Sequence, residues 1–440
     1  MEKKQGSVLA LFPLVVFLSL FIGSGVMTGD FYQLPVLVAA LLASAVALVM
    51  NRKESFGVKV ERFAKGAGHP DIMIMVLIFL LAGAFSATAK GMGAVESTVN
   101  LALSVLPQNI MIAGLFVIAA FISLSMGTSM GTIAALAPIG VGIGEQTGIS
   151  LSVAMAAVVG GAMFGDNLSI ISDTTIAAVR SQQTKMKDKF KTNFFIVLPA
   201  AIVTILLFIF VTSSQEVQVT IGEFQWVKVL PYVGVLIAAI AGVNVIAVLA
   251  GGIVLAGAIG LVDGSYTLST FVGKVAEGLN GMAEIVILTM LIGGIVEIIK
   301  HNGGIQFLLN LVSKNVRSPK GAQFSIAGLV SATNFATANN TISIIVAGPL
   351  AKQIADQYDI DARKSASILD IFSCAIQGII PYGAQLLVAA QMASLSPLEI
   401  IPFSFYPMLI ALCGALAIVF NFPSVKAKPV QSTKEVYLNN

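Results

Sequence analysis

Two aspartates lie seven residues apart in an otherwise apolar part of the chain. They belong to the stretch FGDNLSIISDTT (164–175), as Asp166 and Asp173, and the next basic residue is Arg180. A carboxylate in membrane hydrocarbon is costly unless something compensates its charge. A desolvated carboxyl group favours its protonated form and a bound cation favours the ionised form, so one such group can exchange a proton for Na⁺. The alternative is a buried hydrogen bond, or for Asp173 a place at the membrane edge.

Two clusters of small and amide-bearing residues interrupt further apolar segments. One is Gly127-Thr128-Ser129 and the other is Asn339-Asn340-Thr341. Such residues let a helix unwind at membrane depth, and the freed carbonyls and side-chain oxygens are the hard ligands that Na⁺ takes. Close helix packing is the alternative for one cluster, but two matched clusters favour a site. We therefore expect Na⁺ near Thr128, Ser129, Asp166, Asn340 and Thr341.

A third candidate segment reads CAIQGIIPYGAQLL (374–387). Pro381 lacks an amide donor and Gly383 is conformationally permissive, so we expect the helix to break there. Gln377 and Gln385 then offer neutral amides to a bound ion or solute. Asp370, about two helical turns before the break, is a weaker candidate.

The composition indicates a membrane protein. Of 440 residues, 57% are hydrophobic and 11% are charged. Apolar runs of about twenty residues recur, each long enough to cross a bilayer as a helix. The sequence has no phosphate-binding G-x-x-x-x-G-K-[ST] loop and no protease motif, and its two cysteines and two histidines are too few for a disulfide framework or a zinc site. We expect no enzyme activity, no cofactor other than a coupling ion, and no nucleic-acid partner.

The two halves of the chain resemble each other at an offset of 211 residues. Residues 73–93 then align with 284–304 without a gap, and Pro138 aligns with Pro349. Where a loop of one half is rich in basic residues, the equivalent loop of the other half has few or none. Loops 51–70 and 180–191 hold five basic residues each, whereas their partners 262–281 and 391–402 hold one and none. In the second half, 312–323 and 352–364 hold three each, and their partners hold none.

Because basic loops stay in the cytoplasm, this pattern predicts an inverted-topology repeat, which is typical of secondary transporters. The fold class is thus all-α and polytopic, with about ten spans, two re-entrant hairpins and broken helices. The first half (1–213) contains hairpin 110–140, the second (214–422) contains hairpin 322–350, and a tail (423–440) follows. The expected spans are 8–28, 32–50, 71–89, 154–179, 192–213, 219–240, 243–262, 282–300, 366–390 and 403–422. Both termini are expected in the cytoplasm, and the protein in the inner (plasma) membrane.

The sequence resembles the NhaC-type Na⁺/H⁺ antiporter family, within an ion-transporter group with paired re-entrant hairpins that includes Na⁺-coupled carriers of amino acids and organic acids. The matching motifs are FGDNLSIISDTT, SMGTSMGTIAALAPIG (125–140) and QGIIPYGAQ (377–385). The resemblance covers about residues 8–422. It implies that Asp166, Ser172, Asp173 and Thr174 line an ion pathway, and that the protein is a homodimer with an elevator-like motion. Ile170 stands where the family motif usually has proline.

Na⁺/H⁺ antiport by alternating access is the leading functional hypothesis. The second is Na⁺-coupled transport of a small organic solute such as an amino acid or organic acid, whose polar groups the two glutamines would bind. A channel or a membrane scaffold is a third possibility, which the broken helices in both halves disfavour.

Overall fold

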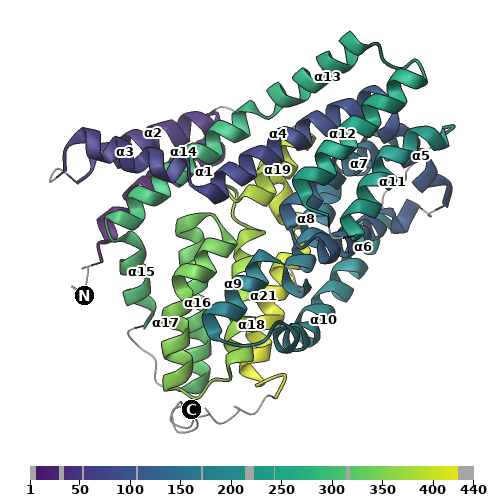
Figure 1. Cartoon of the computed structure of the whole chain (residues 1–440). Coiled ribbons are helices and arrows are strands. Elements are labelled where there is room, and N and C mark those ends of the chain that lie inside the picture. The colour runs from purple at the N-terminus through teal and green to yellow at the C-terminus, as the bar shows by residue number, and fades with distance from the viewer. Residues whose placement is uncertain are drawn as a thin grey trace, which may run out of the picture.

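The structure is a computed structural model, and it describes residues 6–28, 34–51, 54–105, 108–169, 172–213, 222–241, 243–313 and 318–424. All regular secondary structure among these residues is helical. In Figure 1, α4, α12, α13 and α14 lie in the upper part of the molecule, and the hairpin α16–α17 with α18 and α21 lies beneath them. The first half comprises η1 (Val8–Leu11), α1 (Phe12–Thr28), α2 (Val36–Val49), α3 (Phe56–Ala67), α4 (Pro70–Gly91), α5 (Ala94–Val105), α6 (Gln108–Met126), α7 (Ser129–Thr147), α8 (Leu151–Leu168), α9 (Asp173–Gln182) and α10 (Met186–Ser213). The second half comprises α11 (Trp226–Ile240), α12 (Val245–Val262), α13 (Leu268–Gly281), α14 (Ala283–His301), α15 (Gly304–Ser313), α16 (Pro319–Thr337), α17 (Asn340–Gln357), α18 (Ala362–Gln377), α19 (Ala384–Ala393), α20 (Pro397–Ile400), η2 (Ile401–Phe403) and α21 (Phe405–Val419).

Helix bounds recur at the 211-residue offset. The bounds of α6 shifted by 211 coincide with those of α16, and α9 shifted by 211 coincides with α19. The helices α7 and α17 begin at equivalent residues, and so do α8 and α18. Both halves therefore have the same order of helices. The domain boundaries and the inverted membrane orientation stay predictions, and most of the predicted tail (from 425) lies outside the described residues.

Each predicted span corresponds to a helix or to a broken pair of helices. The predicted spans 154–179 and 366–390 are each interrupted, as α8 with α9 and α18 with α19. The predicted hairpins are the pairs α6–α7 and α16–α17, and both extend beyond the predicted bounds. The predicted span 219–240 is helical only from Trp226 onward.

Five helical stretches among the described residues are long and apolar enough to cross a membrane by themselves. They are α4, α8 with α9, α10, α12, and α13 with α14. α19 and Pro397–Phe403 reach this length and apolarity only as a pair, which is bent by 97° as in a broken span or a re-entrant loop. Shorter apolar helices lie in α1, α2, α6, α11 and α21. The predicted number of about ten spans therefore includes long helices and shorter apolar helices. The exact number of spans stays a prediction.

Two helices were missed by the sequence analysis, which treated their residues as loops. They are α3 and α13, equivalent in the two halves, and each packs against a long helix of the opposite half. On α13, a Cβ atom at Gly278 would lie 2.2 Å from the carbonyl oxygen of Gly83 on α4. On α3, a Cβ atom at Gly66 would lie 2.5 Å from the carbonyl oxygen of Gly293 on α14. Only glycine permits these two crossings, because small residues let helix backbones approach closely.

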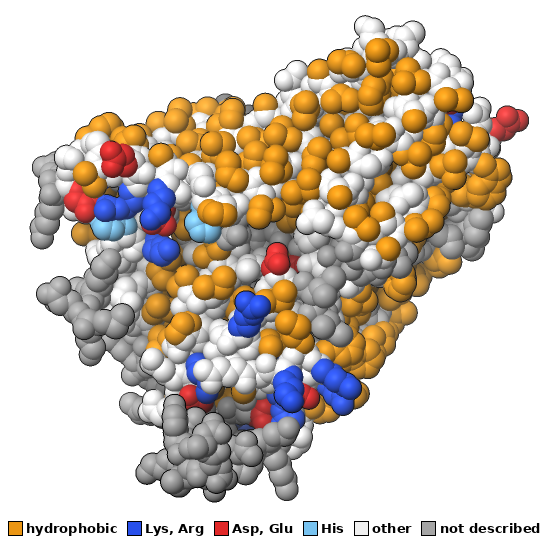
Figure 2. All heavy atoms as spheres, in the orientation of Figure 1, with side chains coloured by type: hydrophobic (Ala, Val, Ile, Leu, Met, Phe, Trp, Pro, Cys, Tyr) orange, Lys and Arg blue, Asp and Glu red, His pale blue; other side chains and the backbone are white. Residues whose placement is uncertain are grey.

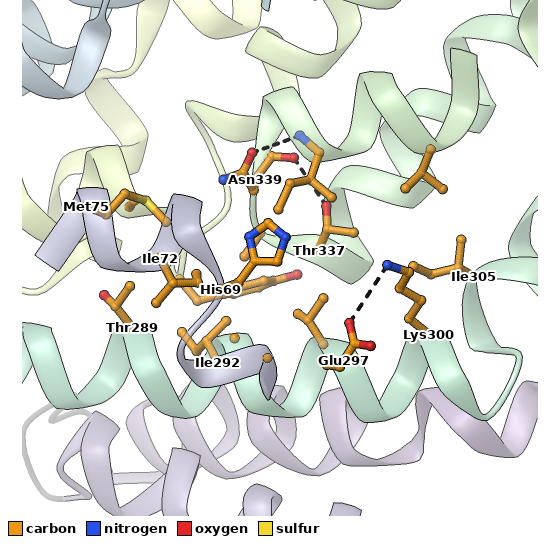
Figure 3. A pocket seen from close by; sticks show the side chains of 18 of the residues that line it. His69, Ile72, Met75, Thr289, Ile292, Glu297, Lys300, Ile305, Thr337 and Asn339 are labelled. Carbon is orange, nitrogen blue, oxygen red and sulfur yellow. Dashed lines mark hydrogen bonds and ion pairs between the residues drawn. The ribbon is translucent and has the colours of Figure 1, made fainter. Parts of the chain in front are cut away.

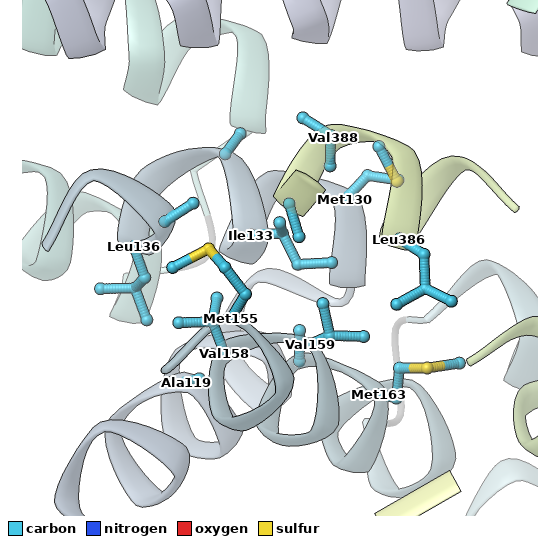
Figure 4. Close-up of a cluster of buried hydrophobic side chains, with 14 of the residues drawn as sticks. Ala119, Met130, Ile133, Leu136, Met155, Val158, Val159, Met163, Leu386 and Val388 are labelled. Atoms are coloured by element: carbon cyan, nitrogen blue, oxygen red, sulfur yellow. The ribbon is translucent and has the colours of Figure 1, made fainter. Parts of the chain in front are cut away.

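The first hairpin packs tightly against the broken spans. Figure 4 shows side chains of α6, α7, α8 and α19 meeting in one buried cluster, with Ile133 on α7, Val159 on α8 and Leu386 on α19. Gly161 and Gly165 of α8 face α6, where added Cβ atoms would lie 2.3 Å from Phe116 O and 2.1 Å from Ser123 Oγ. The contact of α7 with α19 is matched in the other half by a contact of α17 with α9. Each hairpin thus packs on the broken span of the opposite half.

The surface is largely apolar. Figure 2 shows hydrophobic side chains over the upper and right-hand parts of this face, and charged side chains gathered beside α2 and α3 and at the lower end of the molecule. Large apolar side chains such as Leu41, Phe210 and Val254 are exposed. Exposed apolar patches of this extent are expected where lipid covers the protein.

Candidate functional site

The two hairpins have equivalent tips. Gly127 and Ala338, 211 residues apart, both have left-handed backbones, with φ of +69° and +52°. The next residues, Thr128 and Asn339, cap the helices that follow: Thr128 Oγ1 accepts from Gly131 N at 3.5 Å, and Asn339 Oδ1 accepts from Ile342 N at 2.9 Å. The chain therefore reverses at equivalent positions in the two halves. The helices α7 and α17 begin directly after these turns. Left-handed backbone costs a non-glycine residue roughly 1–2 kcal/mol, so Ala338 is strained.

Asp166 is bound by the first residue of α7. Its Oδ1 accepts from Ser129 N at 3.0 Å and its Oδ2 accepts from Ser129 Oγ at 2.5 Å. Both residues are buried. The N-terminus of a helix carries a partial positive charge and unsatisfied N–H groups, so it stabilises a carboxylate. This contact compensates the cost of the buried acid in part.

Two glutamines of the second half complete this polar centre. Gln385 Nε2 donates to Ser129 Oγ at 3.1 Å, and Gln377 Nε2 donates to Gln385 Oε1 at 2.7 Å and to Ala338 O at 3.1 Å. Gln377 Oε1 is buried and accepts no hydrogen bond within the described part of the chain. A buried acceptor without a donor is costly. A bound cation or a donor group of a solute would satisfy it.

The break between α8 and α9 frees backbone carbonyls next to the acid. Thr174 Oγ1 and Thr175 Oγ1 donate to Asp166 O at 3.2 and 3.4 Å. Ser172 precedes α9, and its Oγ lies 2.8 Å from Thr174 Oγ1. Asp173 is the first residue of α9 and is exposed. Hydroxyl groups of the second half-helix thus replace the hydrogen bonds that the first half-helix loses at its end.

The hairpin tips and both breaks surround one cavity of about 1010 Å³. It contains twelve of the predicted site residues: Gly127, Thr128, Ser129, Asp166, Ser172, Asp173, Thr174, Asn339, Asn340, Thr341, Gln377 and Gln385. Arg180 and Asn244 line it as well, and the sequence analysis did not single them out. The roles of the predicted residues stay predictions, but their types and their common cavity agree with a site.

Asp370 does not line this cavity. It is fully buried, and its Oδ2 lies 2.8 Å from Lys189 Nζ, which is 1% exposed. Asn167 Nδ2 and Asn193 Nδ2 donate to the same oxygen at 3.0 and 2.7 Å. The sequence analysis counted Lys189 only as one of several basic loop residues. Nothing in the run of lysines at 185–191 marks this one as buried, because its partner lies 181 residues away in the chain.

A smaller cavity of about 190 Å³ lies on the other side of the second hairpin tip. Figure 3 shows His69, Thr289, Glu297 and Lys300 around it, with Asn339 on the opposite wall. Asn339 lines both cavities. The second hairpin tip therefore separates two hollows that differ in size and polarity.

The oxygen atoms in the large cavity suit a hard monovalent cation. The Asp166 carboxylate, Gln377 Oε1 and the hydroxyl of Thr341 are oxygen donors of the kind that Na⁺ prefers. Among the described residues, no three His, Cys, Asp or Glu side chains group in a way that could hold a metal ion.

Comparison with known proteins places the chain in a family. The sequence model of the Na⁺/H⁺ antiporter family matches residues 7–213 and 211–423. The chain is 26% identical over 463 aligned residues to the Na⁺/H⁺ antiporter NhaC of Bacillus subtilis, covering 92% of this chain and 97% of that protein. It is also 26% identical over 198 residues to the malate-2H⁺/Na⁺-lactate antiporter of Bacillus subtilis, covering 45% of this chain and 42% of that protein.

Among solved structures, the YdaH transporter of Alcanivorax borkumensis aligns with a TM-score of 0.43 and 12% sequence identity, over 93% of this chain and 99% of that one. The family match, in contrast, extends over almost the whole sequence, and it agrees with the resemblance inferred from the aspartate motif. Together with the apolar helices, it identifies a multi-pass membrane transport protein and not an enzyme. The chain belongs to the Na⁺/H⁺ antiporter family.

Proposed function

We propose that the protein is a sodium-coupled secondary active transporter that exchanges Na⁺ for H⁺ by alternating access. The cation binds in the large cavity, near Thr128, Ser129, Asp166, Asn340 and Thr341. One observation carries the proposal: a buried carboxylate is held at the N-terminus of a hairpin helix, in a cavity that both hairpin tips and both broken spans line.

The coupling follows from competition at Asp166. The carboxyl group can hold a proton or face a cation, and desolvation makes both occupants favourable compared with a bare charge. Release to opposite sides of the membrane requires that the cavity open alternately. The two halves have the same order of helices, and each hairpin packs on the broken span of the opposite half. Two such halves can exchange roles, which gives one arrangement open to each side of the membrane. We expect this movement in a homodimer of the inner membrane, with both termini in the cytoplasm.

Purified protein in liposomes tests the proposal. An outward Na⁺ gradient is imposed, and the internal pH is followed with a trapped dye in the absence of any organic solute. We expect acidification of the lumen as Na⁺ leaves, and reversal of the pH change when the gradient is reversed. An absence of any Na⁺-dependent flux, of protons or of solute, would contradict sodium coupling altogether.

A second candidate function is Na⁺-coupled transport of a small organic acid or amino acid. Its specific support is the size of the cavity, because about 1010 Å³ lies at the upper end of the range of pockets for small organic ligands and exceeds the need of one Na⁺ ion. Arg180, Gln377 and Gln385 also line it and could bind a carboxylate or an amine. One relative is named as a malate and lactate antiporter.

The same liposomes separate the two candidates. Radiolabelled lactate, malate and a mixture of amino acids are added in turn, once under an inward and once under an outward Na⁺ gradient. Na⁺-dependent accumulation of one of them, without any pH change in its absence, would favour the carrier and overturn simple exchange. A proton flux that none of these solutes alters would favour exchange.

A further inference from the structure

A buried ion pair joins the two halves of the chain behind the large cavity. Lys189 Nζ, at the start of α10, lies 2.8 Å from Asp370 Oδ2 in the middle of α18. The side chains are 1% and 0% exposed. Neither residue lines the cavity. The ion pair therefore belongs to the surroundings of the site and does not contact a transported ion there.

The ammonium group of Lys189 contacts three helices, through one ion pair and two hydrogen bonds. Besides Asp370, its Nζ donates to Asn167 O and to Thr175 Oγ1, both at 2.8 Å. Its ion-pair partner lies on α18, and its two hydrogen-bond acceptors lie on α8 and α9. Lys189 thus connects both sides of the break in the first half to the broken span of the second half.

These contacts stabilise the end of α8. The carbonyl of Asn167 is among the last in the helix and has no partner within it, because the helix ends at Leu168. Lys189 Nζ and Asn193 Nδ2 both donate to it, the latter at 2.9 Å. A cation at a helix C-terminus also interacts favourably with the helix dipole.

The network reaches Asp166 by two short routes. Asn167, which Lys189 holds by its carbonyl, is the next residue in the chain. Thr175, which accepts from Lys189, in turn donates to the carbonyl of Asp166. Tyr406 on α21 fixes the other side of Asn167, since its hydroxyl donates to Asn167 Oδ1 at 2.9 Å. The backbone on the C-terminal side of Asp166 is therefore anchored to Lys189, through Asn167 and through Thr175.

We propose that Lys189, through its ion pair with Asp370, is a positioning residue for the cation site. It holds the end of α8 so that the Asp166 carboxylate stays within reach of Ser129 and of the ion. The inference rests on the proposed binding of Na⁺ at Asp166. A buried ion pair adds little net stability compared with apolar side chains of similar volume, so stability alone does not account for the pair.

The test measures the half-saturating Na⁺ concentration and the maximal exchange rate in liposomes, per amount of monodisperse protein. Lys189→Met keeps most of the length of the side chain and removes the charge and the N–H donors. We expect the half-saturating Na⁺ concentration to rise about tenfold to a hundredfold, as is typical when a partner of a metal ligand is lost, with the maximal rate unchanged. Lys189→Arg keeps the charge but not the three-way geometry, so it should restore affinity in part.

The matched control is Lys187→Met, which makes the same change on an exposed lysine two residues away. It should leave both kinetic parameters unchanged. A Lys189→Met protein that folds and has the half-saturating Na⁺ concentration of the wild type would overturn the proposal, as would an equal effect of the control.

Removal of one partner leaves a buried charge, so the single variant could fail to fold. The double variant Lys189→Met with Asp370→Leu removes both charges and keeps most of the volume. It must also show a raised half-saturating Na⁺ concentration, because Asn167 O and Thr175 Oγ1 lose the ammonium donor. Wild-type affinity in the folded double variant overturns the inference.

Thr175→Val is an independent test. It removes the hydroxyl that connects Lys189 to Asp166 O and leaves the ion pair in place. It should raise the half-saturating Na⁺ concentration less than Lys189→Met does, and an unchanged value would contradict the connection through Thr175.

Different results would refute the inference about Lys189 and the proposed function. A wild-type protein without Na⁺ flux refutes the function, whereas normal wild-type flux with unchanged variants refutes only the role of Lys189.

Discussion

Gln385 and Ser129, 256 residues apart, share one hydrogen bond at the centre of the molecule. Gln385 Nε2 donates to Ser129 Oγ at 3.1 Å, and that hydroxyl donates to Asp166 Oδ2 at 2.5 Å. A neutral amide of the second half thus orients the group that binds the acid of the first half. Asp166 and Gln377 occupy equivalent positions of the two halves, so an acid in the first half corresponds to a neutral amide in the second.

The first prediction concerns this chain of hydrogen bonds. Ser129→Ala removes the hydroxyl and leaves only the backbone N–H to bind Asp166. We expect the half-saturating Na⁺ concentration for exchange to rise about tenfold, because the carboxylate loses its shorter hydrogen bond. Gln385→Leu should have a smaller effect in the same direction.

The control for Gln385→Leu is Gln391→Leu on the same helix. Gln391 Nε2 donates to Gly281 O near the surface and is remote from the cavity. Sodium titrations of the pH change in liposomes measure all three variants. An affinity of Ser129→Ala equal to that of the wild type would show that its hydroxyl is dispensable.

The second prediction concerns the acid itself. Asp166→Asn keeps the shape of the side chain and removes its charge, so it can neither carry a proton nor attract Na⁺. We expect the Na⁺-driven pH change to fall to the level of empty liposomes. The control is Asp356→Asn, an exposed acid that pairs with Lys352 on α17. Size-exclusion profiles should show both variants folded, and normal exchange by a double variant with Asp166→Asn and Asp173→Asn would remove the proposed site.

Much of the fold could be predicted from the sequence because apolar length and helix-breaking residues are local signals. The hairpins follow from runs such as 110–140 with small residues at their middle, and the break near Pro381 follows from its missing N–H. The helices α3 and α13 were missed because they carry charged or polar residues. Their packing depends on glycines such as Gly278, whose partner Gly83 lies in the other half.

Some residues of the candidate site and its surroundings could likewise be predicted from the sequence, and others could not. Asp166, the hairpin tips and the two glutamines could be found because their residue types are unusual in apolar surroundings. Lys189 and Asp370 are different, since one lies in a run of lysines and the other was only a weak candidate. Their burial depends on a contact between distant parts of the chain, which a single sequence does not reveal.

The third prediction concerns the crossing of α13 and α4. Gly278→Ala would place a methyl group 2.2 Å from Gly83 O, so the helices must move apart. We expect a loss of about 1–3 kcal/mol of stability, visible as a lower midpoint of thermal unfolding in detergent. Gly273→Ala is the control on the same helix, because a Cβ atom there meets nothing within 4 Å. A midpoint of Gly278→Ala at or above that of Gly273→Ala would contradict the crossing.

The fourth prediction concerns the start of α18, outside the predicted spans. Asp361 caps this helix, and its Oδ1 and Oδ2 accept from Arg363 Nε and Nη2 at 2.8 and 2.7 Å. Burial alone would raise the pKa of Asp361, but the hydrogen bonds and charge of Arg363 outweigh it and lower the pKa below its ordinary value. The ionised form therefore stabilises the fold above the unfolded-state pKa of about 3.9, and this contribution is lost as the pH falls through the lower folded-state pKa.

Asp361→Asn should keep the cap and lose the ion pair. We expect a loss of about 1 kcal/mol or less at neutral pH, because Arg363 is partly exposed. The difference between the thermal midpoints of wild type and variant should shrink as the pH falls below about 4, and it should vanish once the pH is below the lower folded-state pKa, where the wild-type carboxylate is protonated as well. Asp356→Asn, with its exposed acid, should show no comparable pH-dependent difference. If the midpoint difference for Asp361→Asn is the same in acid as at neutral pH, the charge of Asp361 does not stabilise the start of α18.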